Sequence, residues 1–240
     1  MFNTPEYCQA CAARQFGICR ALNSSEIARL KQIARRRSVA TGEVISREGD
    51  AQFHLATVVS GVVKLGKRLV DGRQQLVGFL FPSDFLGRPL AATSPFTATA
   101  ASDVVLCTYR QAQFENLIRE LPKIEHCLFS HVLNGLDAAQ EWMVLLGQKT
   151  ASEKVASLLL LFARRGERLN GTSLDGSPAI RFEFPLSRAD MADCLGLRIE
   201  TVSRQIGLLK AQGIIQLEGT RIVTVPRIEK LLASAETERA

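Results

Sequence analysis

Residues 187–204 read SRADMADCLGLRIETVSR, and this stretch predicts two short helices joined by a tight turn. Ser187 can cap the first helix, and Asp190 falls at its third position, as in a capping box. The pair of helices also needs a small residue for close approach, a glycine for the turn and a β-branched core residue. These three positions are occupied by Ala192, Gly196 and Val202. The stretch therefore predicts a helix-turn-helix.

The second helix is expected over residues 199–211, and its first turns carry three polar side chains at steps of three and four. Residues at these steps lie side by side on one helix face. In the major groove, the arginine can donate twice to guanine, the glutamate can accept from cytosine, and the serine can contact thymine or phosphate. A surface ion pair between the glutamate and the arginine is the alternative. The candidate base-reading residues are Glu200, Ser203 and Arg204.

A hairpin is expected directly after the second helix. Residues 214–217 and 221–225 flank the turn Glu218-Gly219-Thr220, as in the wing of a winged helix. Arginines beside this hairpin and at the start of the first helix can hold phosphates, which sets the register on DNA without reading bases. The candidate phosphate contacts are Arg188 and Arg221.

Three cysteines near the start of the chain form a C-x2-C-x7-C run, and a fourth stands alone far along the sequence. This spacing fits a thiolate site for an iron–sulfur cluster or for zinc, completed by the distant cysteine on folding. The alternative for the distant cysteine is a plain core position in a strand. Cys127 and Cys194 lie among helix-like residues and are expected to be small buried hydrophobes. The candidate ligands are Cys8, Cys11, Cys19 and Cys107.

The middle of the chain, residues 38–106, consists of short apolar runs broken by turn signals such as Ser60-Gly61. This pattern predicts an all-β roll or barrel. Before it, residues 22–37 are predicted to form a surface helix capped by Ser24 or Ser25. The expected strands include residues 56–59, 62–65 and 75–81.

A long helix is expected from Pro122, because proline is well suited to a first helical turn. Apolar residues then recur at alternating steps of three and four, which is the spacing of a coiled-coil seam. A second copy of the chain is the expected partner of this seam, and packing against the helix's own domain is the alternative. The candidate dimer residues are Phe129, Val132, Leu136, Ala139, Met143 and Leu146.

The helix is expected to pause at residues 147–150 and to be followed by an apolar helix over residues 151–165. A Gly-, Ser- and Asn-rich loop over residues 166–178 and a strand at residues 180–184 lead to the helix-turn-helix. The predicted fold is α+β. Its expected parts are a cysteine-rich segment (1–21), a β-roll (22–121), a dimerisation helix (122–149) and a winged helix-turn-helix domain (150–240).

The chain has 240 residues, a formal net charge of +6 and a pI near 9.2. This length allows two modest domains, and the basic balance suits an anionic partner. The N-terminal residues lack the order of a secretory signal, and the longest apolar run, residues 155–163, is too short to span a bilayer. We therefore expect a cytoplasmic protein without membrane contact.

The sequence contains no nucleotide-binding glycine motif and no group of carboxylates, histidines or serines at catalytic spacing. Its histidines, His54, His126 and His131, are isolated from one another. A small redox enzyme that uses an iron–sulfur cluster is the enzymatic alternative, and nothing in the sequence supports it. The chain is therefore not expected to be an enzyme.

With these motifs in place, the chain resembles the CRP/FNR superfamily of bacterial transcription regulators, and within it the oxygen-responsive FNR branch. The resemblance covers nearly the whole chain and is closest to FnrL/FnrN-type members. It is carried by the four cysteines, by LLGQKTASEKVASLL at residues 145–159, by VGFLFPSDFLGRPL at residues 77–90 and by ETVSR at residues 200–204.

The resemblance implies a β-roll like the cyclic-nucleotide-binding jelly roll and a [4Fe-4S] cluster bound in the absence of oxygen. It also implies a homodimer held by the long helix, which activates or represses genes at a palindrome of the TTGAT-N4-ATCAA type. We expect that oxygen oxidises the cluster, changes the coordination of the four thiolates and thereby disturbs the dimer seam. An activator also contacts RNA polymerase, and the hairpin at residues 70–74 is the candidate surface for this contact.

The cyclic-nucleotide branch of the superfamily places a glutamate after the pocket glycine and an Arg-Ser pair further on. Here Arg88 follows Gly87, and Phe96-Thr97-Ala98 stands at the position of the pair. A buried phosphate would lack its arginine, so control by a cyclic nucleotide is not expected. The remaining alternative is a CRP-like regulator with structural zinc or with another small-molecule effector in the β-roll.

Overall fold

The computed structural model describes residue 8 and residues 11–170, 179–219 and 221–236. The chain divides into two compact units, residues 1–137 and 138–240. The loop was predicted over residues 166–178, and its residues 171–178 lie outside the described residues. The turn residue Thr220 lies outside them as well. The four expected domain bounds remain predictions.

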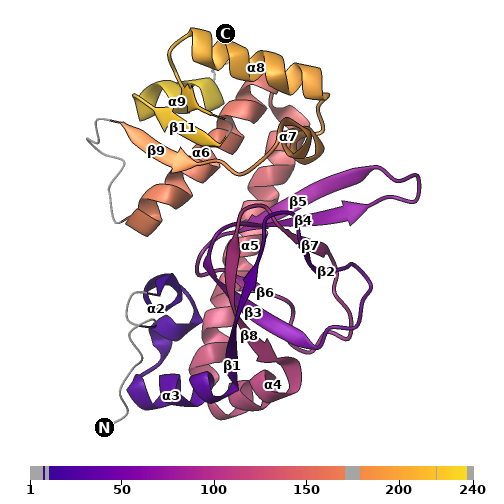
Figure 1. Ribbon diagram of the computed structural model, residues 1–240, viewed down its shortest axis with the longest axis vertical. Helices are drawn as coiled ribbons and strands as arrows, with labels where there is room; N and C mark the ends of the chain where they lie inside the picture. Colours follow the sequence, from indigo (N-terminus) through magenta and orange to yellow (C-terminus); the bar gives the residue numbers. More distant parts are fainter. Residues whose placement is uncertain (1–7, 9–10, 171–178, 220, 237–240) are drawn as a thin grey trace. The chain divides into compact units, whose positions relative to one another are not determined.

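The first unit is built on two four-stranded antiparallel sheets (Figure 1). One sheet has the order β1-β8-β3-β6 and the other the order β2-β7-β4-β5. Alternating residues of both sheets bury a shared apolar core that includes Val58, Val63, Ala98 and Leu106. This arrangement is the predicted jelly roll. The strands are β1 (Ala34–Val39), β2 (Val44–Ser46), β3 (His54–Ser60), β4 (Val63–Arg68), β5 (Gln74–Leu80), β6 (Phe85–Leu86), β7 (Thr97–Ala100) and β8 (Val104–Arg110).

The helix predicted over residues 22–37 is shorter than expected. Helix α3 covers Ser24–Ile33, and the following arginines belong to strand β1, which pairs with β8. The cap is Asn23 and not Ser24 or Ser25: the Glu26 amide donates to Asn23 Oδ1 at 2.9 Å, and the Asn23 amide donates to Glu26 Oε2 at 2.8 Å. The backbone bonds to β8 are non-local, which is why helical periodicity did not reveal them.

A second apolar core, the outer core, lies on the outer face of the β1-β8-β3-β6 sheet. Helix α2 (Ala12–Phe16), the 3-10 helix η1 (Ile18–Ala21), α3 and α4 (Gln111–Glu120) contribute to it. Phe114 is fully buried there, and the centroid of its ring lies 5.0 Å from the ring centroid of Tyr109 of β8. The Lys123 ammonium donates to Glu26 Oε1 at 3.1 Å and so links α3 to the start of helix α5 (Pro122–Gln148). The sheet is thus covered on both faces.

Helix α5 (Pro122–Gln148) begins at the predicted proline and continues through the division between the units. Four apolar side chains of the predicted seam are well exposed: Phe129 (60%), Val132 (66%), Leu136 (53%) and Met143 (65%). Ala139 is exposed as well, and Leu146 is half-buried. Among the described residues, these exposed positions therefore do not form a core face.

The second unit combines helices with a three-stranded antiparallel sheet of order β10-β11-β9. Helix α6 extends to Asn170, five residues beyond its predicted end at Arg165. Helix α9 was not predicted; it packs on α6. No helix among the described residues is long and apolar enough to cross a membrane. The elements are α6 (Ala151–Asn170), β9 (Ile180–Glu183), α7 (Arg188–Leu195), α8 (Ile199–Ala211), β10 (Gln216–Glu218), β11 (Ile222–Val225) and α9 (Ile228–Ala235).

Candidate functional site

The predicted capping box starts helix α7. The Asp190 amide donates to Ser187 Oγ at 3.0 Å, and the Ser187 amide donates to Asp190 Oδ2 at 3.0 Å. Gly196 ends the helix in the left-handed conformation, with a φ of 63°. Since this conformation is costly for residues with a Cβ, the glycine makes the tight turn into α8 possible.

Helix α8 is held by one face and exposes the other. Val202, Ile206 and Leu209 are buried against the unit's core. The predicted base-reading residues Glu200, Ser203 and Arg204 are all exposed on the free face. Neither Glu200 nor Arg204 makes an ion pair with a residue that the structure describes, so the alternative of a surface ion pair is not seen.

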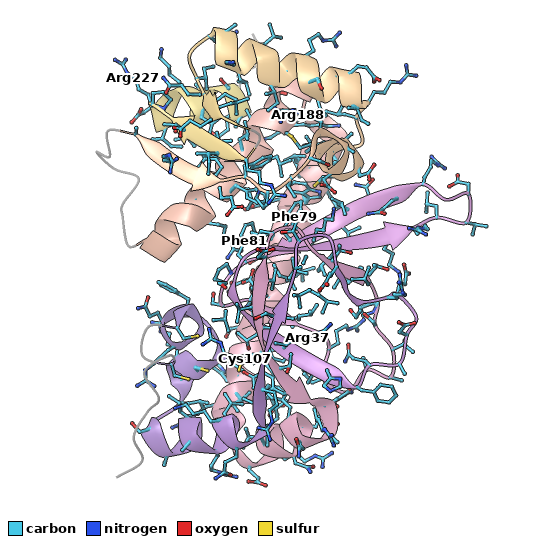
Figure 2. All side chains as sticks on the ribbon, in the orientation of Figure 1. Arg37, Phe79, Phe81, Cys107, Arg188 and Arg227 are labelled. Atoms are coloured by element: carbon cyan, nitrogen blue, oxygen red, sulfur yellow. The ribbon has the colours of Figure 1, made fainter. Side chains whose placement is uncertain are left out.

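The two predicted phosphate contacts differ in their surroundings. Arg221 is exposed at the start of the wing, and its carbonyl accepts from the Phe184 amide at 2.6 Å. Arg188, labelled in Figure 2, is half-buried, with Nη1 3.4 Å from Met191 Sδ. Burial lowers the pKa of Arg188. Arg198, the N-cap residue of α8, is a further exposed arginine that sequence reasoning did not name.

The four predicted cysteine ligands line one cavity of about 60 Å³ in the first unit. Cys8 and Cys11 precede helix α2, Cys19 belongs to η1, and Cys107, labelled in Figure 2, belongs to strand β8. The fold therefore joins the N-terminal run to a cysteine that is distant in sequence. All four thiols are free and half-buried.

Strand β8 and η1 explain how the cavity forms. In the sheet, Cys107 stands opposite Arg36 of β1 and Thr57 of β3. Because side chains alternate along a strand, Cys107 and Tyr109 share the outer face of the sheet. On the N-terminal side, Ile18 is buried in the outer core and holds η1 against this face. Cys19 and Cys107 both pack on that core.

The thiols of this cavity are difficult to ionise in the protein alone. Burial raises the pKa of Cys19 from 9.0 to about 12, and the neighbouring cysteines add to the effect. Burial also raises the pKa of Cys107, which a hydrogen bond with Tyr109 partly offsets. The pKa of Cys8 is raised by burial and lowered in part by Lys31. A metal that binds here would have to displace these protons.

Three basic side chains also line the cavity, and sequence reasoning did not identify them as part of a site. They come from α2, α3 and β1. Among the described residues that line the cavity, none is acidic. The signal in the sequence was the position of the first one, three residues after Cys11, which places it one helical turn away. The three are Arg14, Lys31 and Arg36.

Within the described ranges, no three His, Cys, Asp or Glu side chains are placed to hold a metal ion. Outside the cavity, Cys194 is fully buried in α7, as predicted, whereas Cys127 is only half-buried on α5.

Two family models match the chain. A Crp-like helix-turn-helix domain matches residues 153–234, and a cyclic nucleotide-binding domain matches residues 36–120. The first covers the unit that contains α7 and α8, and the second covers the strands of the jelly roll.

Similar proteins span almost the whole chain. The transcriptional activator protein FnrL of Cereibacter sphaeroides is 43% identical over 95% of this chain and 91% of its own length. The nitrogen fixation regulation protein FixK of Bradyrhizobium diazoefficiens is 37% identical over 95% of this chain and 94% of its own length. The solved structure of FixK2 from Bradyrhizobium japonicum is 29% identical, with a TM-score of 0.74, over 86% of this chain and 100% of that one.

These relatives are regulators and not enzymes, as the sequence predicts. The jelly roll, the long helix and the helix-turn-helix occur in the order that the resemblance implied. The chain therefore belongs to the CRP/FNR family of transcription regulators, in its FNR-like branch.

Proposed function

We propose that this regulator senses oxygen through a [4Fe-4S] cluster held by Cys8, Cys11, Cys19 and Cys107. One observation carries the proposal: cysteines from the N-terminal run and from strand β8 line a single cavity. Four cysteine side chains are the usual ligand set of such a cluster. The names of the relatives mention no cluster, so the proposal rests on the residues of this chain.

The residues fit this group in donor chemistry and in charge. The cavity offers four sulfur donors, and its charged lining is entirely basic among the described residues. This lining suits a group that four thiolates make negative. When bound, the cluster would supply reactivity toward oxygen.

The same core that supports the cysteines also supports the start of helix α5. Ile124 is a fully buried member of the outer core, and Leu128 packs against that core, as Cys19 and Cys107 also do. The exposed apolar seam begins one residue later, at Phe129. A change in the seating of the cysteines would therefore reach the seam through contiguous packing. We propose that two copies pair along Phe129, Val132, Leu136, Ala139, Met143 and Leu146.

Pairing through α5 would present two copies of α8 to a palindromic DNA site. We propose a site of the TTGAT-N4-ATCAA type, read by Glu200, Ser203 and Arg204 and held through phosphates by Arg221 and Arg188. The exposure of the three base-reading residues on a helix anchored by Val202 supports this assignment. A regulator of bacterial genes would work in the cytoplasm.

We propose the β4-β5 hairpin as a contact for RNA polymerase. Its tip turns at Gly72, with a φ of 86°, and the Gly72 amide donates to the Leu69 carbonyl at 3.0 Å. Leu69 (50%) and Val70 (110%) expose apolar surface at this tip.

A small-molecule effector is the second candidate function. A wider cavity of about 550 Å³ lies on the jelly roll beside Gln52, His54, Arg110 and Glu115. The arginine expected for a cyclic phosphate is absent from Phe96-Thr97-Ala98. Cyclic AMP should therefore leave the melting temperature unchanged, and a clear upward shift at micromolar cyclic AMP would favour this second function.

The test of the main proposal is purification without oxygen. We expect a brown protein with about four irons and an equal amount of sulfide per chain, and bleaching on exposure to air. Size-exclusion chromatography before and after air should show loss of dimer. A colourless protein with one zinc per chain would contradict the cluster, and a dimer that survives bleaching would contradict the switch.

A further inference from the structure

Arg14 lines the cysteine cavity and carries a buried donor that nothing satisfies. Its Nη1 atom is inaccessible to solvent and has no hydrogen-bond partner among the described residues. An unsatisfied buried donor is destabilising, and it is more so when the group is charged. Such groups in native proteins are rare and call for an explanation, which includes a missing bound group.

Among the described residues that line the cavity, ionised cysteines are the strongest acceptors available to Arg14. Arg14 lies within electrostatic range of Cys8 and of Cys19, and it follows Cys11 by one helical turn. No described residue that lines the cavity is acidic. Neutral thiols are weak acceptors, whereas thiolates and the sulfides of a cluster are anionic. The buried cation therefore matches an anionic occupant better than an empty cavity.

We propose that Arg14 is a positioning residue that donates a hydrogen bond through Nη1 to the anionic iron–sulfur group of the cavity. This inference rests on the proposed function above. Charge-assisted hydrogen bonds are stronger than neutral ones. Hydrogen bonds to the sulfurs of an iron–sulfur cluster also help to set its reduction potential. Arg14 compensates negative charge that the thiolates bring into an apolar cavity, and it thereby slows the loss of iron. Lys31 and Arg36 add positive charge at the same cavity.

The test compares the wild-type chain with Arg14→Gln, Arg14→Lys and Arg20→Gln, all loaded without oxygen. Arg20→Gln is the matched control, because Arg20 is exposed on η1 and does not line the cavity. Iron and sulfide per chain are measured first. Iron release to a ferrous chelator is then followed in the absence of oxygen. We expect about tenfold faster release from Arg14→Gln, the order expected for one charge-assisted hydrogen bond, and wild-type release from Arg20→Gln. Arg14→Lys should lie between them.

A second measurement separates this role from a structural one. The apo form of Arg14→Gln should melt at or above the melting temperature of the wild-type apo form, because the substitution removes an unsatisfied charge. The loaded form of Arg14→Gln should melt below the loaded wild type. An equal fall in both forms would overturn the inference, and so would equal iron release from Arg14→Gln and Arg20→Gln. If the wild-type chain takes up no iron and sulfide, the proposed function fails and takes this inference with it. If the wild type loads and Arg14→Gln behaves like it, the inference alone fails.

Discussion

Helix α8 and the cysteine cavity present their candidate functional side chains in opposite ways. Helix α8 buries Val202 and exposes Glu200 and Arg204 to solvent. In the cavity, Cys19 and Cys107 are themselves packed on the outer core, and Arg14 has a buried unsatisfied donor. The first region separates the residues that support the fold from those that act. The second uses the same residues for both purposes.

This difference teaches what substitutions in each region should do. Changes on the exposed face of α8 should alter DNA binding with little effect on stability, because surface substitutions rarely change folding free energy by more than about 0.5 kcal/mol. Changes in the cavity should alter the occupant and the packing of the first unit together. Four substitutions, in order of decreasing expected effect, examine this contrast.

The largest effect is expected for Cys107→Ser. Serine keeps the size of the side chain and removes the only sulfur donor that β8 contributes to the cavity. We expect cluster iron to fall to a small fraction of the wild-type content, measured together with sulfide after anaerobic purification. Cys127→Ser, on α5 and outside the cavity lining, is the control and should load normally. Normal loading of Cys107→Ser would remove Cys107 from the ligand set.

A charge in the centre of the α5 seam should come next. Leu136→Glu places a carboxylate on the exposed apolar stripe, where pairing would bury it without a partner. We expect dimer affinity to fall about 100-fold or more, measured by analytical ultracentrifugation. Asn134→Glu adds the same charge to the opposite face of the helix and should leave the dimer intact. If both variants dimerise equally, the seam lies elsewhere.

The exposed face of α8 should show a smaller effect that is confined to DNA. Arg204→Ala removes a bidentate donor, which should weaken binding to the palindrome by about 1–3 kcal/mol and relax discrimination at one base pair. The melting temperature should not change. Arg221→Ala should instead weaken binding to all DNA sequences. It should also reduce the slope of log binding constant against log salt concentration by about one. Uniform loss of affinity in Arg204→Ala would assign Arg204 to phosphate contact.

The smallest effect is expected for Ser187→Ala, which removes the cap of α7. The Asp190 amide then loses its acceptor, so the free energy of unfolding should fall by about 1 kcal/mol, measured by urea denaturation of the full chain. Ser203→Ala, at an exposed position within α8, is the control. Its free energy of unfolding should stay within about 0.5 kcal/mol of the wild-type value. An unchanged stability in Ser187→Ala would mean that α7 is held by its buried face alone.

Sequence reasoning succeeded for most features whose determinants are local, although it placed the cap of α3 at Ser24 or Ser25 and not at Asn23. The cap Ser187-Asp190, the turn glycine Gly196 and the start of α5 at Pro122 all depend on neighbouring residues, and all are observed. It was wrong about residues 34–37, which pair with β8, and it missed α9, which packs on α6. In these two cases, contacts with distant segments decide the structure, and a single sequence carries no direct record of them.

The sequence by itself determined the four candidate cysteine ligands and the face of α8 that carries the candidate base-reading residues. The chemistry of cysteine and the period of a helix are properties of short segments, so both could be predicted locally. Only the tertiary structure decided that Cys107 shares a cavity with Cys8, Cys11 and Cys19, and that Arg14 has a buried donor inside it. The register of β8 against β1 and β3 fixes the position of Cys107. That register depends on packing across the whole sheet and not on any local pattern.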